Sequence, residues 1–408
     1  EAVMIYQNYQ VVADLSDPIR KFAEHARDIS LTWFDGKRIT PLQRMAAYYE
    51  QVALLGFTHV RPEFNIAPVM NAKGVAVPVL ESKVYGTPFC DLMCFKREDA
   101  VDLPKVLLVA PMSGHFATLL RGTVQTLVQD HEVYLTDWRN IRDIPMSEGV
   151  FGLDEYIEHI IWFMQHLGPN AHLMGVCQPT VACLAATAVM AEDRSDCQPA
   201  SLTLMAGPID TRVNPTQVNE LAMTKPIEWF EQNLVGMVPL HFKGVGRRVY
   251  PGFMQLMAFL NMNMDRHRQS FKTLYEHRVN GEDEKADLIR DFYKEYFAIM
   301  DLSGPFYLET VKHVFQDHLL PKGLLTYKGR PLNMKAIRKT FLLTVEGERD
   351  DICGMGQTLA AQDLCSLLPD YRKTHHLQAG VGHYGVFNGK RWDAQIYPVV
   401  RNMIRSAH

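Results

Sequence analysis

Hydrophobic and polar positions in residues 105–208 alternate between short apolar runs and longer stretches with helical periodicity. The apolar runs are "KVLLVAPM", "HEVYLTDW", "AHLMGV" and "SLTLMAGP", and each has the length of a buried strand. Helix-like stretches separate them, of which "LDEYIEHIIWFMQHLG" is the clearest amphipathic example. Strands that alternate with helices in this way predict an α/β fold, with a mostly parallel sheet flanked by helices on both faces.

The alternation stops at residue 209 and resumes after residue 325. Residues 209–325 lack clear strand patterns and are rich in Met, Phe and Tyr. The rhythm then returns with "KTFLLTVEGERDDI" and "HHLQAGVGHYGVF" and closes with the helix-like "RWDAQIYPVVRNMI". We therefore expect one core built from residues 101–208 and 326–408, interrupted by a helical lid or cap.

Residues 1–100 are expected to form a helical extension followed by the first strands. The stretch "SDPIRKFAEHARDI" has a cap signal at Ser16 or Asp17, with Pro18 in the first turn of the predicted helix. Strand-like patterns follow between residues 74 and 98.

Charge and hydropathy exclude several classes of partner. The 408 residues carry a formal net charge of −4 and contain no long Lys/Arg run, so neither nucleic acid nor an anionic membrane surface is expected as a partner. No apolar stretch has the length of a transmembrane helix. No secretory signal is visible after the opening "EAVMIYQNYQ". We interpret Met4 as the natural start, with a removed signal peptide as the alternative.

The seven cysteines match neither a zinc site nor a disulfide framework. Six of them fit buried, inert thiols in a reducing compartment. Cys177 differs, because "GVCQP" lies between a predicted strand and a predicted helix. This is the position of a nucleophile elbow, whose sharp turn projects a side chain above the sheet and favours small neighbours such as Gly175. The following helix N-terminus favours a thiolate and offers free N–H groups to an oxyanion.

The usual elbow has the pattern G-x-nucleophile-x-G, and Pro179 takes the place of its last glycine. A buried core cysteine beside a strand end is therefore the competing interpretation of Cys177.

An elbow of this kind requires an acid and then a histidine later in the chain. Asp350 in "TVEGERDDIC" and His383 in "AGVGHYGVF" both follow predicted strands, at the sheet edge where open α/β folds build their sites. Asp351 is a rival acid that spacing alone does not exclude. His375 and His376 are rival bases, but they precede "LQAG" at the start of a strand, on the wrong edge of the sheet.

The oxyanion donors are expected from two loops. Gln178 follows Cys177 directly, so its backbone N–H is the first candidate. The second is expected from "APMSGHF", at Met112 or Ser113, although a simple turn also explains this serine. His115 in the same loop is expected to line the substrate pocket or to cap the next helix.

The motifs "GVCQPT", "TDWRN", "YPGFMQLMAFLNMN" and "FYLETV" resemble those of the intracellular polyhydroxyalkanoate (polyhydroxybutyrate) depolymerases. The resemblance covers nearly the whole chain from Met4 and implies an α/β-hydrolase fold. It implies Cys177 as nucleophile, Asp350 as acid and His383 as base. The implied substrate is the polyester of carbonosomes, the storage granules of bacteria, and the implied products are 3-hydroxybutyrate oligomers and monomer. A cytoplasmic, granule-associated enzyme without a metal or organic cofactor is expected, and a homodimer stays an open hypothesis.

Two other functions compete with depolymerisation. Polyhydroxyalkanoate synthases also use a Cys on this fold and share a "TDWRN"-like motif, but their elbow ends in glycine, unlike "CQP". Release of CoA from 3-hydroxybutyryl-CoA would distinguish a synthase. A non-catalytic granule-binding protein is the other alternative, because residues 250–264 offer Met and aromatic side chains to a polyester surface. Within this stretch we expect Met257 and Phe259 to contact substrate, whereas ordinary packing of the lid is the competing interpretation.

Overall fold

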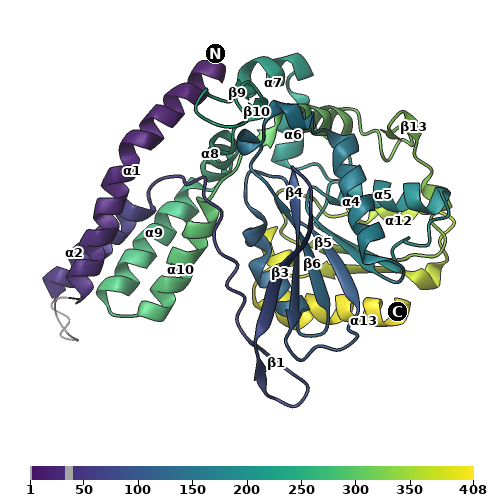
Figure 1. The fold of residues 1–408 in the computed structure, drawn as a ribbon, viewed down its shortest axis with the longest axis horizontal. Coiled ribbons are helices and arrows are strands. Elements are labelled where there is room, and N and C mark those ends of the chain that lie inside the picture. Colours follow the sequence, from purple (N-terminus) through teal and green to yellow (C-terminus); the bar gives the residue numbers. More distant parts are fainter. Residues whose placement is uncertain (1, 33–39) are drawn as a thin grey trace.

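The centre of the fold is an eight-stranded sheet in the computed structural model, which describes residues 2–32 and 40–408 (Figure 1). In spatial order its strands are β3 (Val79–Gly86), β4 (Cys90–Arg97), β6 (Glu132–Trp138), β5 (Lys105–Val109), β7 (His172–Val176), β8 (Ser201–Met205), β14 (Phe341–Gly347) and β15 (Lys373–Gln378). The strands from β6 to β15 run parallel, and β3 and β4 are antiparallel to their neighbours. The predicted mostly parallel sheet is confirmed.

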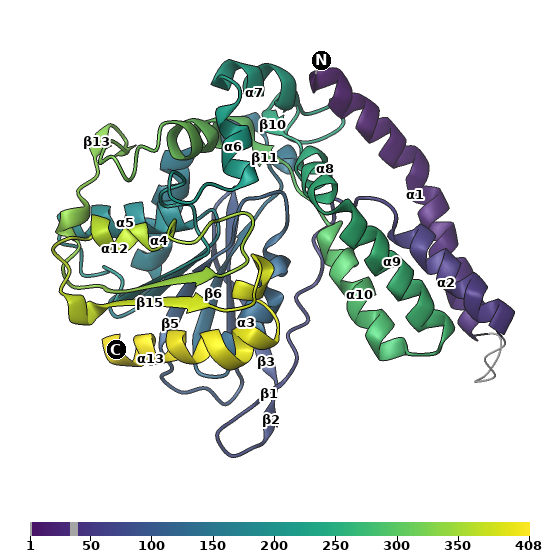
Figure 2. The same cartoon turned by 180° about the vertical axis from the view of Figure 1, so that it is seen from behind.

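Helices cover both faces of this sheet, as the alternating pattern predicted (Figures 1 and 2). The two layers consist of α4 (Leu153–Leu167) with α5 (Thr180–Glu192), and of α3 (Arg121–Leu127) with α13 (Tyr397–Ala407). Nearly every residue of α5 is buried, which fits the uniformly small and apolar sequence "TVACLAATAVMAE". Small side chains let this helix approach the sheet closely, and it is the helix that follows Cys177.

The insertion between β8 and β14 is mainly helical. It contains α6 (Gln217–Met223), α7 (Ile227–Leu234), α8 (Gly252–Met262), α9 (Met264–Val279), α10 (Asp283–Tyr296) and α11 (Gly304–Glu309). The insertion also contains a small antiparallel sheet, which the sequence did not reveal and which joins β9 (Gly236–Met237), β10 (Arg248–Tyr250) and β11 (Leu302–Ser303). Strands of two or three residues are too short to show an alternating pattern in a sequence.

The N-terminal part begins with two long helices, α1 (Ala2–Thr32) and α2 (Thr40–Leu54). The predicted helix start at Ser16 or Asp17 is wrong, because α1 continues through Pro18. A proline inside a helix removes one backbone hydrogen bond and costs about 3 kcal/mol. Packing of α1 along α2 offsets this cost. Two short strands, β1 (Val69–Met70) and β2 (Ala76–Val77), then form a small hairpin beyond the sheet (Figure 2).

The N-terminal helices pack against the insertion rather than against the sheet. Helices α1, α2, α9 and α10 lie side by side in both views (Figures 1 and 2). Gln51 donates a hydrogen bond of 2.6 Å to the Phe271 carbonyl. The Arg278 guanidinium binds the buried Glu50 carboxylate at 2.8 and 3.0 Å. Segments more than two hundred residues apart in the chain therefore form one helical group.

The base of α8 is held by a close backbone contact at Gly252. Its N–H donates to the Asp301 carboxylate at 2.9 Å. A Cβ at this position would lie 2.5 Å from the Met300 carbonyl oxygen. Because the obstructing atom belongs to the backbone, a side-chain rotation cannot relieve the overlap.

We expect Gly252→Ala to lower the free energy of unfolding by about 1–3 kcal/mol through this overlap. The direction is informative, because alanine is otherwise the better helix former by about 1 kcal/mol. Urea denaturation of the variant measures the change. Gly382→Ala is the matched control, since its Cβ would meet its nearest atom, the Arg349 carbonyl oxygen, only at 3.7 Å. Equal stability of the Gly252 variant and the native chain would contradict the prediction.

Candidate active site

Cys177 lies on a sharp turn between β7 and α5, in a left-handed conformation with φ of 67°. Backbone in this region is strained for a residue with a Cβ and persists only where the surroundings impose it. The Cys177 N–H donates to the Met205 carbonyl at 2.7 Å, and the Thr180 hydroxyl donates to the Cys177 carbonyl at 2.8 Å. The half-buried thiol therefore projects from the carboxyl end of the sheet.

Two glycines make room for this turn. A Cβ at Gly175 would lie 2.9 Å from Cys183 Sγ and 3.3 Å from Thr180 Cα. A Cβ at Gly207, directly after β8, would lie 1.8 Å from the Thr180 hydroxyl. In the usual elbow the last glycine allows the strand and helix to pack closely. Here Gly175 and Gly207 allow this close packing around Thr180. Pro179 is tolerated because it directly precedes the helix.

The loops after β14 and β15 bring a carboxylate and an imidazole together. Asp350 Oδ2 accepts a hydrogen bond from His383 Nδ1 at 2.8 Å, and both side chains are buried. Asp350 Oδ1 accepts two backbone hydrogen bonds of 2.9 Å, from Ile352 and Cys353. Three of the four hydrogen-bonding positions of this carboxylate are therefore filled in a fixed orientation.

The rival residues lie elsewhere. Asp351 is exposed and lines the second cavity described below, and the hydrogen bond of His383 Nδ1 goes to Asp350 instead. His375 is on β15, where Nδ1 lies 2.8 Å from the Thr344 hydroxyl and Nε2 3.4 Å from Glu346. His376 lies on the same strand and pairs with Gln378 at 2.9 Å. Of the candidates from the sequence, the structure brings together Asp350, His383 and Cys177.

The side chains of Asp350, His383 and Cys177 shift one another's pKa values. His383 is hydrogen bonded to Asp350, and its charge interacts with that of Cys177. Burial alone would lower the pKa of His383, but the Cys177 thiolate and the Asp350 carboxylate together raise it well above its usual value. A hydrogen bond from Cys353 and the His383 imidazolium outweigh burial and lower the pKa of Cys177 to about 5. Both shifts favour a thiolate and an imidazolium at neutral pH.

Cys353 is one of the six cysteines expected to be inert, but its ionisation is coupled to that of Cys177. The hydrogen bond to the Cys177 thiolate, together with burial, raises the pKa of Cys353 well above its usual range. It therefore stays protonated as a donor. The only sequence signal was its place three residues after Asp350, within the same loop.

The loop expected to supply an oxyanion donor lies beside the elbow. The Met112 N–H points at the side-chain oxygen of Gln178, at 3.4 Å, so both predicted donor residues meet here. Ser113 follows in the same loop and is half-buried. The "TDWRN" motif fixes this loop, because Thr136 and Trp138 bind the N–H and C=O of Ala110 at 2.9 and 3.1 Å.

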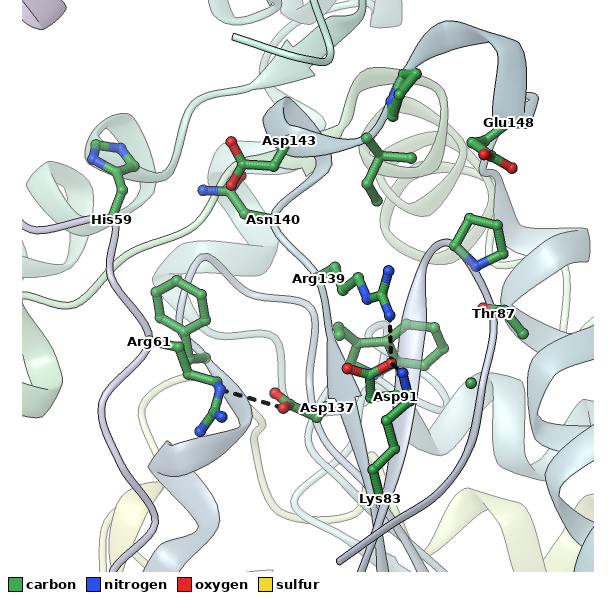
Figure 3. Close-up of a pocket in the computed structure, with 16 residues that line it drawn as sticks. His59, Arg61, Lys83, Thr87, Asp91, Asp137, Arg139, Asn140, Asp143 and Glu148 are labelled. Carbon is green, nitrogen blue, oxygen red and sulfur yellow. Dashed lines mark hydrogen bonds and ion pairs between the residues drawn. The ribbon is translucent and has the colours of Figure 1, made fainter.

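The same motif also lines a polar cavity of about 630 Å³, shown in Figure 3. Asp137 pairs with Arg61 at 3.3 Å, while Asp91 binds Lys83 and Arg139 at 2.8 and 2.6 Å. Burial raises the pKa of Asp137 to about 6, with Arg61 opposing the shift. The cavity is lined by none of the triad candidates.

A second cavity, of about 600 Å³, opens between helices α8 to α10 and the loops after β14 and β15. His383 lines it together with mainly apolar side chains, among them Phe259, Met262, Leu288, Phe292, Tyr296 and Tyr384. The imidazole of the Asp350–His383 pair therefore faces an apolar cavity under the insertion.

Two residues expected to bind substrate do not line this cavity. Met257 is 44% exposed on α8. His115 is buried, and its Nε2 lies 3.0 Å from the Tyr296 carbonyl, so that it joins the oxyanion loop to α10. Burial lowers the pKa of His115 to about 4, with the bond to Tyr296 opposing the shift. The ring is therefore neutral at physiological pH.

The central sheet, the cysteine turn after β7 and the Asp–His pair after the last two strands define an α/β-hydrolase. Residues 206–408 match the family described as "PHB de-polymerase C-terminus", and this half of the chain belongs to that family. The match supports ester hydrolysis as the class of reaction. A search of curated proteins finds no match.

Similar solved structures include two hydrolases. One is a 2-hydroxy-6-oxo-6-phenylhexa-2,4-dienoate hydrolase from Rhodococcus sp. strain RHA1, 15% identical, with a TM-score of 0.43 over 81% of this chain and 100% of that one. The other is a thermophilic esterase from Thermogutta terrifontis, 14% identical, with a TM-score of 0.42 over 81% of this chain and 99% of that one. Within the described residues, every helix is too short or too polar to cross a membrane.

The charged pair predicts selective labelling of one thiol. We expect iodoacetamide to modify Cys177 ahead of the other cysteines, because only a thiolate is an effective nucleophile. The labelling rate should fall as the pH drops through about 5, where the Cys177 thiolate becomes protonated. Peptide mass spectrometry over a pH series measures this profile. A midpoint near that of a free cysteine, or equal labelling of several cysteines, would contradict the ion pair.

Proposed function

We propose that the chain hydrolyses the ester bonds of polyhydroxyalkanoate, in particular polyhydroxybutyrate, with Cys177 as nucleophile, His383 as base and Asp350 as acid. The observation that carries this proposal is the buried Asp350–His383 pair, which interacts electrostatically with Cys177 and whose imidazole lines a mainly apolar cavity. The match of residues 206–408 to the depolymerase family supports the polyester as substrate.

In the first step the Cys177 thiolate attacks the ester carbonyl, and a C–S bond forms. The His383 imidazolium gives its proton to the leaving alkoxide as the C–O bond breaks. Asp350 is fixed by two backbone N–H groups, so it keeps the imidazole oriented and stabilises its charge. The leaving group is the shortened polymer with a free hydroxyl end, and a 3-hydroxyacyl thioester remains on the enzyme.

Water completes the cycle. The neutral His383 takes a proton from a water molecule that attacks the thioester, and the acid product leaves as Cys177 returns to the thiolate. The oxyanion of each tetrahedral intermediate is held by the Gln178 N–H and by an N–H of Met112 or Ser113. A donor of this kind contributes about 3 kcal/mol. The Gln178 side chain, now 3.4 Å from the Met112 N–H, gives way to the substrate oxygen.

The substrate reaches the thiolate beneath the insertion. We assign residues 209–325 the role of a lid, since α8, α9 and α10 build one side of the cavity. A polyester chain is apolar and water-poor, which matches the Phe, Leu, Met and Tyr side chains of the lining. The enzyme then works at the surface of storage granules in the cytoplasm and releases 3-hydroxybutyrate oligomers and monomer.

The two neighbouring carboxylates provide a sharp test of the triad. Asp350→Asn should lower turnover by about three to four orders of magnitude, because the amide no longer balances the imidazolium. Asp351→Asn, a change of the same size one residue away, should stay within about twofold, since that side chain is exposed. Product release from native amorphous granules is measured by mass, with Cys177→Ala as the inactive reference. A loss of turnover by orders of magnitude in Asp351→Asn would show that Asp350 is not the acid of the triad.

The lid assignment predicts a split between substrates. Phe259→Asp should slow cleavage of granules by about 10- to 100-fold, because a charge replaces an apolar wall of the cavity. Cleavage of a short soluble ester should fall much less. Met257→Asp is the control on the exposed side of the same helix and should have the smaller effect. Parallel losses on both substrates, with a lowered melting temperature, would show that Phe259 only packs the insertion.

A further inference from the structure

The second cavity is mainly apolar, but two guanidinium groups also line it. Arg266 lies on α9, and Arg349 lies in the loop after β14, directly before Asp350. Within the described part of the chain, neither side chain forms an ion pair or a hydrogen bond. Among the described residues that line the cavity, Asp351 supplies a single carboxylate. The wall of the cavity therefore carries an excess of positive charge.

The acidic residues directly beside these two arginines in the chain are engaged elsewhere. Asp265 pairs with Arg268 at 3.8 Å. The Glu348 carboxylate accepts a hydrogen bond of 2.7 Å from the Gly380 N–H. Asp350 is bound to the histidine of the triad. An anionic ligand can therefore approach either guanidinium without displacing one of these carboxylates.

The backbone of Arg349 is held against the loop that carries His383. The Arg349 N–H donates to the Val381 carbonyl at 2.9 Å, two residues before His383. A Cβ at Gly382 would lie 3.7 Å from the Arg349 carbonyl oxygen, so the loops after β14 and β15 are adjacent here. Arg349 therefore lines the cavity from the same pair of loops that holds the Asp–His pair.

Arg266 reaches the cavity from the insertion. Nδ1 of the neighbouring His267 lies 2.9 Å from the Tyr293 hydroxyl, and this contact joins α9 to α10. Burial and the nearby Arg266 lower the pKa of His267, so that its ring is neutral at physiological pH. The two guanidinium groups thus belong to separate segments, and the cavity lies between those segments.

We propose that Arg349 and Arg266 bind the terminal carboxylate of a linear 3-hydroxyacyl chain, so that the enzyme selects free chain ends and short oligomers over interior segments of the polymer. The proposal rests on the proposed function, because it takes the polyester as the substrate. A guanidinium binds a carboxylate through two parallel N–H bonds. The apolar side chains of the same cavity accept the methyl and methylene groups of the chain.

The chemistry of the ester sets the direction of the bound chain. In a linear 3-hydroxyacyl polyester, the carbonyl of each ester lies toward the hydroxyl end, and the alkoxy oxygen lies toward the carboxyl end. When Cys177 attacks, a C–S bond forms and the C–O bond breaks. The leaving alkoxide, which takes its proton from His383, therefore carries the terminal carboxylate. The guanidinium groups also offset the repulsion between this carboxylate and the Cys177 thiolate.

A pair of substrates that differ in charge tests the proposal. The linear 3-hydroxybutyrate trimer is compared with its terminal methylamide, which keeps the internal esters and removes the charge. Products are measured by mass. For the native enzyme, kcat/KM should be about tenfold higher for the acid, because the arginines are exposed and their charge-assisted hydrogen bonds are partly screened.

Substitutions at the two arginines should lower this ratio. Arg349→Ala and Arg266→Ala should each reduce it by about threefold or more, mainly through a higher KM for the acid, and Arg349→Lys should retain part of it. Arg290→Ala is the matched control, because Arg290 lies on α10 and is not part of the described lining of the cavity. It should keep the native ratio.

Binding without turnover gives an independent measurement. Calorimetry on the Cys177→Ala variant should show that the trimer acid binds about tenfold more tightly than the methylamide at low salt. Adding Arg349→Ala and Arg266→Ala to this variant should remove the difference. High salt should reduce it, because exposed charges are screened.

A native kcat/KM ratio near one would overturn the proposal, and so would a ratio that neither arginine substitution changes. Equal losses on the acid and the methylamide would also overturn it and leave the arginines a structural role. Failure of the proposed function has a different signature. The native enzyme would then cleave neither trimer, or Cys177→Ala would still cleave them, while the calorimetry would still report whether the arginines bind the carboxylate.

Discussion

The left-handed backbone of Cys177 is the constraint on which the rest of the site depends. This conformation costs about 1–3 kcal/mol, so the surrounding structure has to impose it. It does so with the bond to the Met205 carbonyl and with two glycines that clear the space around Thr180. Once the turn is formed, Cys177 lies beside the loops that follow β5, β14 and β15. The strained backbone of Cys177 thereby determines which loops lie next to its thiol.

Much of the core could be predicted because parallel strands, buried on both faces, leave uninterrupted apolar runs in a sequence. The same rhythm located Asp350 and His383 at strand ends, where backbone topology alone brings them near Cys177. Sequence periodicity failed where an element is too short to have a period, as in β9 to β11, and where tertiary packing overrides a local signal, as at Pro18 in α1.

Contacts between separate loops also could not be predicted from the spacing of residues along the chain. Cys353 looked like one more buried thiol because nothing in its neighbourhood along the chain points to Cys177. His115 looked like a pocket residue, although its ring joins the oxyanion loop to α10. The "TDWRN" motif acts in a similar way: Asn140 accepts a hydrogen bond of 3.1 Å from the N–H of Asp301, whose carboxylate holds the start of α8. A motif without a reacting group thus connects the oxyanion loop with the base of the insertion.

The pairing of α2 with α9 has a consequence for how the chain is made. Gln51 and its partner Phe271 are 220 residues apart. At about 5–20 residues per second, the ribosome completes α9 some 10–40 s after α2 has emerged. During that interval α2 cannot yet form its contacts with α9 and α10, while the strands from β3 to β8 are already being synthesised. The group of α1, α2, α9 and α10 therefore forms late in folding. The turn at Cys177 can form before this group encloses the cavity.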